Sequence, residues 1–343
     1  MKISSSAPQN HPKIKFGKIG ILIVNLGTPD GYDFFSLRRY LREFLLDKRV
    51  IEISSWIWRP ILFGYILNFR PHKIRHGYAK IWNTSKDESI LRTHTRDQAN
   101  DLAKRLKNIP HVIVDWAMRY GKPSINETIN RLKKEGCDRL LIFPLYPQYS
   151  AATTATVQDK VFQKLMKMRW MPALRTTPPY YDDQSYISAL ANSVSEHFES
   201  LKWDPEMLLV SFHQMPVSYL VKGDPYGCHC YKTARLLKEA LGWPDDRFKI
   251  CFQSRFGKVK CLEPYTDKTV EELARNGVKR MAVITPGFSS DCLETSYEIA
   301  HEAEEIFINC GGEQFTQVPC LNSSNLGMDL LEKITRRELM GWI

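Results

Sequence analysis

Residues 207–216 read M-L-L-V-S-F-H-Q-M-P, an apolar run that ends abruptly at His213. The run over 207–213 predicts a buried strand, and such continuous apolar strands are typical of parallel sheets covered by helices on both faces. Ligands of these sheets bind outside the carboxyl ends of the strands, so we expect His213 at the rim of a ligand site. The alternative is a histidine hydrogen-bonded within the core.

The rest of the chain alternates in the same way between apolar runs and segments with helical periodicity. Further strands are predicted at 18–27, 111–118, 139–146, 249–254 and 280–286. Helices are predicted at 33–46, 89–107, 124–135, 152–168, 184–200, 228–241, 266–276, 292–308 and 324–336. Right-handed crossovers between parallel strands are then the default connection.

Two distant segments share one pattern. Residues 119–148 begin R-Y-G-K-P, and residues 255–288 begin R-F-G-K-V. Each continues through a helix that ends in glycine, Gly136 or Gly277, and then through a basic residue that opens an apolar strand. We therefore predict an α/β fold of two similar Rossmann-like lobes, each a parallel sheet flanked by helices, with the active-site cleft between them. Chance similarity of generic units is the alternative.

The length of 343 residues exceeds one ordinary core and fits two lobes. Their junction is expected near 172–184, a segment with three prolines. The predicted organisation is a flexible N-terminal extension at 1–17, a first lobe at 18–175 with an apolar lip at 31–69, a second lobe at 176–322 that carries the metal site, and a C-terminal helix at 323–343.

The formal charge of +10 favours anionic partners such as lipid headgroups or an acidic small molecule. The basic residues are scattered, so no nucleic-acid partner is expected. None of the eight cysteines forms a C-x-x-C pair. Cys228 and Cys230 flank His229, which leaves a soft-metal site as the weaker alternative to reduced thiols.

The localisation predicted from the sequence is cytoplasmic. The first residues, M-K-I-S-S-S-A-P, lack the apolar core of a secretory signal. Residues 51–69 are rich in Trp, Ile, Leu and Phe, but Arg59 and Pro60 interrupt them, and a spanning helix needs about 20 mostly apolar residues. This segment is either core or an exposed lip that meets a membrane surface or a flat apolar ligand.

Residues 286–305 read P-G-F-S-S-D-C-L-E-T-S-Y-E-I-A-H-E-A-E-E, a predicted strand end followed by a helix. Glu294, Glu298 and Glu302 recur at every fourth position on this helix, where like charges repel each other. We interpret them either as a solvated face or as an acidic track that handles cations or protons.

His213 and Glu294 both follow strands of the predicted second lobe, so they form a candidate pair. Imidazole and carboxylate bind borderline divalent metals such as Fe²⁺, and together they also transfer protons. Residues 25–30 hold a single glycine and no G-x-G-x-x-G, which disfavours a dinucleotide site. The aromatic residues near these strand ends suit a large planar ligand.

The chain resembles ferrochelatase, the family that inserts Fe²⁺ into a porphyrin in the last step of haem synthesis. The resemblance covers roughly residues 18–325. It rests on V-N-L-G-T-P-D (24–30), Y-P-Q-Y-S (146–150), S-F-H-x-M-P (211–216) with K-G-D-P-Y (222–226), F-Q-S-R-F-G (252–257) with P-Y-T-D-K-T (264–269), and P-G-F-S-S-D-C-L-E-T (286–295).

The resemblance implies that the porphyrin is clamped between the lobes, with His213 as the cleft histidine and Glu294 as the acid opposite it, both catalytic and metal-binding. It implies that Glu298 and Glu302 form the acidic track and that the lip admits the porphyrin, often beside a membrane. The implied porphyrin pocket contains Arg119, Tyr120, Phe288, Asp291 and, with a weaker local match, Lys80.

Three positions depart from the family pattern. Gln214 follows the histidine where the family usually has glycine, and Cys261 stands where many members carry tryptophan. Ala151 occupies the position of a cluster cysteine in animal members, so no iron–sulfur cluster and no permanent cofactor are expected. The predicted reaction is insertion of Fe²⁺ into protoporphyrin IX to give protohaem and two protons. The alternatives are a porphyrin or haem carrier without turnover, and a chelatase for coproporphyrin or another metal.

Overall fold

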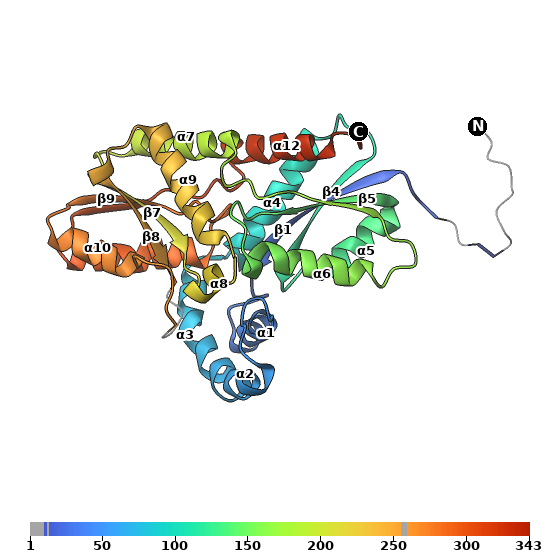
Figure 1. The fold of residues 1–343 in the computed structure, drawn as a ribbon, viewed down its shortest axis with the longest axis horizontal. Helices are drawn as coiled ribbons and strands as arrows, with labels where there is room; N and C mark the ends of the chain where they lie inside the picture. The colour runs from blue at the N-terminus through green and yellow to red at the C-terminus, as the bar shows by residue number, and fades with distance from the viewer. Residues whose placement is uncertain (1–9, 12–13, 255–258) are drawn as a thin grey trace.

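The computed structural model describes residues 10–11, 14–254 and 259–343 and consists of two α/β lobes side by side (Figure 1). The first lobe contains a parallel sheet of strand order β4-β1-β5-β6, formed by β1 (Lys18–Gly27), β4 (Val112–Tyr120), β5 (Cys137–Pro144) and β6 (Ala173–Thr176). The second contains β10-β9-β7-β8, formed by β7 (Met207–His213), β8 (Phe248–Gln253), β9 (Arg280–Ile284) and β10 (Gln314–Gln317). A short antiparallel pair joins β2 (Trp82–Asn83) and β3 (Glu88–Ser89).

The two sheets have the same topology. In each, the first strand in sequence lies between the second and the third, and the fourth strand is added outside the third. The shared pattern of the two segments therefore reflects a repeated fold, and the predicted fold class is confirmed. Gly136 and Gly277 lie just beyond the ends of their helices with φ of 99° and 95°, as expected for glycine at a helix C-terminus.

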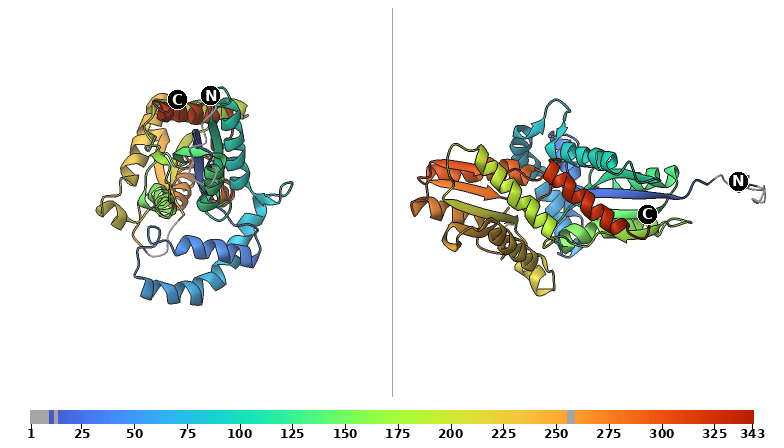
Figure 2. Two further views of the ribbon diagram at one scale, coloured as in Figure 1. Left: turned by 90° about the vertical axis from the view of Figure 1, so that its right-hand side faces the viewer. Right: turned by 90° about the horizontal axis from the view of Figure 1, so that it is seen from above.

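Helices cover both faces of each sheet (Figures 1 and 2). Those of the first half are α1 (Phe34–Leu45), α2 (Ser55–Ile61), the π-helical η1 (Leu62–Ile66), α3 (Leu67–Lys80), α4 (Ile90–Arg105), α5 (Ile125–Glu135), the π-helical η2 (Ala151–Ala155) and α6 (Thr156–Leu165). Those of the second half are α7 (Gln184–Ser200), α8 (Val217–Val221), α9 (Tyr226–Leu241), the 3₁₀ turn η3 (Asp245–Arg247), α10 (Thr266–Arg275), the π-helical η4 (Glu294–Ala303), α11 (Glu304–Asn309) and α12 (Asn325–Leu339).

One of the hydrophobic clusters spans both lobes. A single cluster of buried side chains runs from Ile21 and Ile23 of β1 to Leu208 and Val210 of β7. The helices α7 and α12 pack against each other along one side of the molecule, and α12 also packs against α4 of the first lobe (Figure 2). Apolar packing therefore fixes the position of β1 relative to β7. Such packing stabilises the folded state by about 25 cal/mol per Å² of buried apolar area.

Several elements differ from the sequence prediction. The strands β6 and β10 were not predicted, because each has only four residues and lies at a sheet edge, so an apolar run is absent. The predicted helix 292–308 is π-helical over its first ten residues, from Glu294 to Ala303. The predicted extension 1–17 and the segment R-F-G-K (255–258) lie largely or wholly outside the described residues.

Candidate active site

His213 is the last residue of β7 and is half-buried. It pairs with Gln253 of β8 in the sheet. Gln214, the residue after His213, also contacts Gln253, because Gln214 N donates to Gln253 O at 2.9 Å. The ring atom Nδ1 lies 2.8 Å from the carbonyl oxygen of Gln214. A carbonyl only accepts, so Nδ1 carries the hydrogen and the neutral ring has its free lone pair on Nε2.

Glu294 is the first residue of η4 and lies close to the same strand ends. The side chain of Gln253 donates from Nε2 to the backbone oxygen of Glu294 at 2.6 Å. Gln253, the strand partner of His213, thus also contacts Glu294. The structure therefore brings these two predicted residues to one edge of the second sheet.

Glu294 also faces the first lobe. The pKa values of the Tyr40 and Tyr78 hydroxyls are raised well above their usual value. Burial is the main cause, and the negative charge of Glu294 adds to it in both. These tyrosines belong to α1 and α3, and the neighbouring Leu293 packs against a cluster that includes Tyr78. The candidate catalytic edge is therefore at the junction of the lobes, beneath the helices α1 and α3.

The acidic track runs along η4 from the lobe junction to the surface. Glu298 is half-buried and accepts a hydrogen bond from Ser254 Oγ. Burial and the nearby charge of Glu294 raise the pKa of Glu298 to about 8, and the hydrogen bond from Ser254 and the charge of Arg70 oppose this shift. Glu302 is exposed. The middle carboxyl of the track therefore holds a proton near neutral pH.

Arg119 and Tyr120 form a buried network inside the first lobe. The guanidinium of Arg119 donates to the carboxylate of Asp47 and, from Nε, to Thr156 O at 2.9 Å, and it lies 4.3 Å from the centroid of the Tyr120 ring. Tyr120 is fully buried, and its hydroxyl donates to Asp47 Oδ2 at 2.9 Å. Both predicted pocket residues already have partners there and hold the loop after α1 against β4.

Asp291 is also committed to internal contacts. Its carboxylate accepts from Thr295 Oγ1 at 2.8 Å, from Gln317 Nε2 at 3.2 Å and from Asn322 Nδ2 at 2.6 Å. It therefore fastens the turn before η4 to the segment after β10. Lys80, at the end of α3, is exposed and lies 5.5 Å from the ring centroid of Tyr297 on η4.

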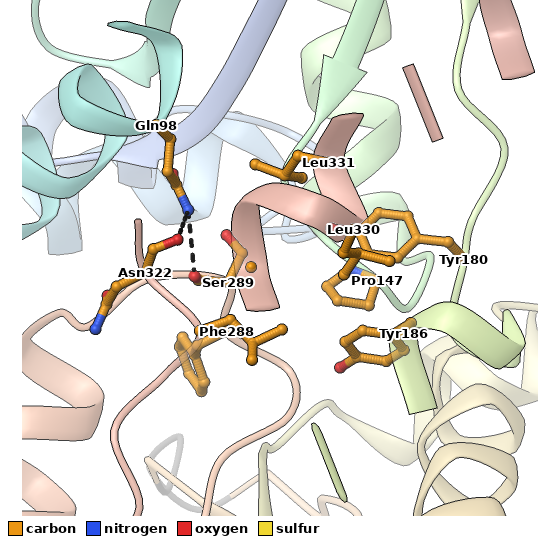
Figure 3. A pocket seen from close by; sticks show the side chains of 11 residues that line it. Gln98, Pro147, Tyr180, Tyr186, Phe288, Ser289, Asn322, Leu330 and Leu331 are labelled. Carbon is orange, nitrogen blue, oxygen red and sulfur yellow. Dashed lines mark hydrogen bonds between the residues drawn. The ribbon is translucent and has the colours of Figure 1, made fainter. Parts of the chain in front are cut away.

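Phe288 lines a small cavity between the lobes (Figure 3). The cavity has a volume of about 10 Å³, and its walls include Gln98 and Tyr186. That space suits about one water molecule. Beside it, Gln98 Nε2 donates to Asn322 O at 2.9 Å, which joins α4 to the second lobe. Phe288 thus packs at this junction while part of its side chain stays exposed.

The residues that depart from the family pattern each have a clear structural setting. Gln214 is buried, and its side-chain amide donates to Ser254 O, so it ties the ends of β7 and β8 together. Cys261 is buried, with Sγ 3.3 Å from Val259 O. Ala151 donates from its backbone nitrogen to Asp224 Oδ2 at 2.7 Å.

Among the described residues, no group of three or more His, Cys, Asp or Glu side chains is arranged to hold a metal ion. Within the same residues, no helix is both long and apolar enough to cross a membrane.

The sequence motifs did not reveal the polar residues that organise the site. Gln253 and Ser254 belong to the quoted F-Q-S-R-F-G, yet nothing in their pattern assigned them a contact with Glu294 or Glu298. Asp47, the partner of Arg119 and Tyr120, lies more than 70 positions from either in the chain. Only the folded structure shows these pairs.

Comparison with known proteins decides the family. The model of the ferrochelatase family matches residues 18–339. The chain belongs to the ferrochelatase family. Ferrochelatase of Allorhizobium ampelinum is 61% identical over 341 residues, covering 99% of each chain. Ferrochelatase of Rhizobium etli is 62% identical over 339 residues, 99% of this chain and 98% of that protein. The resemblance inferred from the motifs is confirmed.

Solved structures extend the comparison to the fold. SirB from Bacillus subtilis with Fe³⁺ has a TM-score of 0.55 and 11% sequence identity, and the match covers 95% of this chain and 97% of SirB. A sirohydrochlorin chelatase SirB in complex with cobalt has a TM-score of 0.51 at 10% identity, covering 94% and 95%. At such low identity the likeness concerns the fold alone, which this ferrochelatase-family chain shares.

Proposed function

We propose that the chain catalyses the ferrochelatase reaction, inserting Fe²⁺ into protoporphyrin IX to give protohaem and two protons. Membership of the ferrochelatase family over residues 18–339 supports the reaction. The observation that supports its location is the connection of His213 and Glu294 through Gln253 at the junction of the lobes. Fe²⁺ is a substrate here, so the site holds it only during turnover.

The two side chains supply what metal insertion needs. Two pyrrole nitrogens must each lose a proton, and Fe²⁺ takes the place of these two protons. The Nε2 lone pair of His213 and the carboxylate of Glu294 are proton acceptors, and both are also ligands for a borderline divalent metal. His213 and Glu294 therefore deliver the metal and accept the protons from the edge of the second sheet.

The acidic track connects the site of His213 and Glu294 with the surface. Glu298 lies one helical turn beyond Glu294, and its raised pKa of about 8 allows it to take up and release a proton near neutral pH. Glu302 follows at the exposed end. Glu298 and Glu302 therefore pass protons away from the site or pass Fe²⁺ toward it.

The pocket residues have two different roles in this proposal. Phe288 and Lys80 lie on elements that meet at the lobe junction, and they contact the porphyrin ring and a propionate, respectively. Arg119, Tyr120 and Asp291 support the pocket through their internal hydrogen bonds. The reaction uses no permanent cofactor and no iron–sulfur cluster, because Ala151 has no thiol at the position of the cluster cysteine.

We also propose peripheral contact of the lip with a membrane surface on the cytoplasmic side. The helices α1, α2 and α3 project from the two lobes (Figure 1). The side chain of Trp56 is 91% exposed, and those of Ile57, Tyr65 and Phe69 are each at least 60% exposed. Residues 53–86 contain no Asp or Glu but several Lys and Arg, so an anionic lipid surface attracts them.

A substrate-by-metal panel tests the reaction. Purified protein is supplied with protoporphyrin IX or a coproporphyrin and with Fe²⁺, Co²⁺, Ni²⁺ or Zn²⁺ under anaerobic conditions, and metalloporphyrin formation is followed by absorbance. We expect the highest kcat/KM for Fe²⁺ with protoporphyrin IX. Binding of porphyrin without turnover under every combination would identify a carrier instead, and a preference for coproporphyrin would change the substrate.

A flotation experiment tests the membrane proposal. Wild-type protein is expected to float with vesicles that contain anionic lipid, and less with neutral vesicles or at high salt. Trp56→Ser with Ile57→Ser is expected to stay with the soluble fraction. Equal flotation of the wild type and this double variant would exclude the lip as the contact surface.

A further inference from the structure

Gln253 ends β8 and is only 4% exposed, although its side chain is polar. Its amide is held from two sides. Ser211 Oγ donates to Oε1 at 2.7 Å, and Nε2 donates to Glu294 O at 2.6 Å. Ser211 is itself 2.9 Å from Thr266 Oγ1, so the whole group is ordered. The amide therefore has one orientation, with its oxygen toward β7 and its nitrogen toward η4.

The backbone of Gln253 acts on His213. Its carbonyl accepts from Gln214 N at 2.9 Å, and the carbonyl of Gln214 accepts from His213 Nδ1 at 2.8 Å. Gln214, whose carbonyl orients the imidazole, is therefore itself held by Gln253 through its backbone N–H. The same residue consequently holds the backbone beside both members of the candidate pair.

Simple packing does not explain this residue. Filling space alone would not require an amide, whose burial is unfavourable unless its groups are hydrogen-bonded. Gln253 instead satisfies both ends of its amide, one of them on the first residue of the acidic track. Groups that orient metal-binding side chains typically change metal affinity or activity by about 10–100-fold when they are removed.

We propose that Gln253 is a positioning residue that sets the spacing between His213 and Glu294. Through its backbone it holds the His213 ring with Nε2 available, and through its amide it holds the start of η4. Gln253 contacts no substrate in this role. The proposal rests on the proposed function of His213 and Glu294.

The test compares Gln253→Met, which has similar volume but no hydrogen-bonding groups, with Gln253→Glu, which keeps the shape and replaces the Nε2 donor by an oxygen. Ser211→Ala is the matched control, because it removes one contact of the same amide and leaves the bond to Glu294 in place. For each, the KM for Fe²⁺, the KM for protoporphyrin IX and kcat are measured, and circular dichroism verifies folding.

We expect both Gln253 variants to raise the KM for Fe²⁺ about tenfold or more, with the KM for porphyrin changed less than about twofold. Ser211→Ala is expected to have the smaller effect on Fe²⁺. If a folded Gln253→Glu variant keeps the wild-type KM for Fe²⁺, or if both KM values rise by the same factor, the positioning role is refuted. Should Gln253→Met fail to fold, Gln253→Glu decides.

A spectroscopic measurement separates positioning from a merely structural effect. In the wild type, ¹⁵N NMR of the neutral His213 ring is expected to show the form with hydrogen on Nδ1. In Gln253→Met the backbone carbonyl of residue 253 still accepts from Gln214 N, so the ring is expected to keep this form, while its signals should need about tenfold more Zn²⁺ to shift because Glu294 is no longer held in place. A wild-type response of the His213 signals to Zn²⁺ in that variant contradicts the proposal.

His213→Ala is measured alongside to keep the two ideas distinct. If that variant inserts Fe²⁺ at the wild-type rate, the proposed function of His213 fails, and with it the reason for positioning the ring. If His213→Ala is inactive while the Gln253 variants keep the wild-type KM for Fe²⁺, the positioning role alone fails.

Discussion

Replacement of Glu298 by Gln should remove a pH-dependent loss of stability. The ordinary pKa of a glutamate is 4.5, and in the folded protein that of Glu298 rises to about 8, chiefly through burial. Between these values the folded state binds more protons than the unfolded state, so the free energy of unfolding falls as pH rises. Each pKa unit corresponds to about 1.4 kcal/mol, which gives a loss of about 3 kcal/mol between pH 5 and pH 8.

The glutamine of the Glu298→Gln variant would keep the shape and the contact with Ser254 but carry no titrating proton, so the variant should lack this loss. Urea unfolding of both proteins at pH 5 and pH 8 measures the difference. The two should have similar stability at pH 5, and the variant should be the more stable at pH 8 by up to about 3 kcal/mol. The half-buried state of the side chain makes this an upper value. A parallel decline of both proteins over this range would refute the reasoning.

Three further changes test the packing around the site. Asp47→Ala leaves the buried Arg119 without its carboxylate and should lower the free energy of unfolding by about 3–5 kcal/mol in a denaturant titration. Gly27→Ala places a Cβ 1.9 Å from Tyr120 O at a φ of +119°, so thermal unfolding should show a lower Tm, and an unchanged Tm would contradict the backbone described here. Tyr219→Phe removes the bond from the α8 hydroxyl to Val50 O, at 2.8 Å, and should cost about 1 kcal/mol in the same titration without changing kcat.

The sequence predicted the central strands well, because their apolar runs are continuous. The strands β1, β5 and β7 are almost entirely buried, and their bounds agree with the predicted ones to within a few residues. The edge strands β6 and β10 are short and partly exposed, so no periodicity marked them. The repeated motif correctly indicated two similar lobes, and the identical strand order of the two sheets confirms it.

The candidate site was predictable only in part. His213 stood out because a polar residue ended an apolar run, and Glu294 because it opened a row of acids on a predicted helix. The surrounding hydrogen bonds depend on contacts between residues far apart in the chain, such as Gln253 with Glu294 and Arg119 with Asp47. Such contacts follow from the packing of the sheets and leave no local signal in the sequence.

The most direct test of the account is the kcat for Fe²⁺ insertion into protoporphyrin IX by His213→Ala and Glu294→Gln, compared with the wild type under anaerobic conditions. Haem formation is followed by absorbance, and the porphyrin affinity of each protein by fluorescence. We expect both variants to bind porphyrin normally and to lose on the order of 100-fold or more in kcat. Wild-type turnover by a folded His213→Ala variant would contradict it.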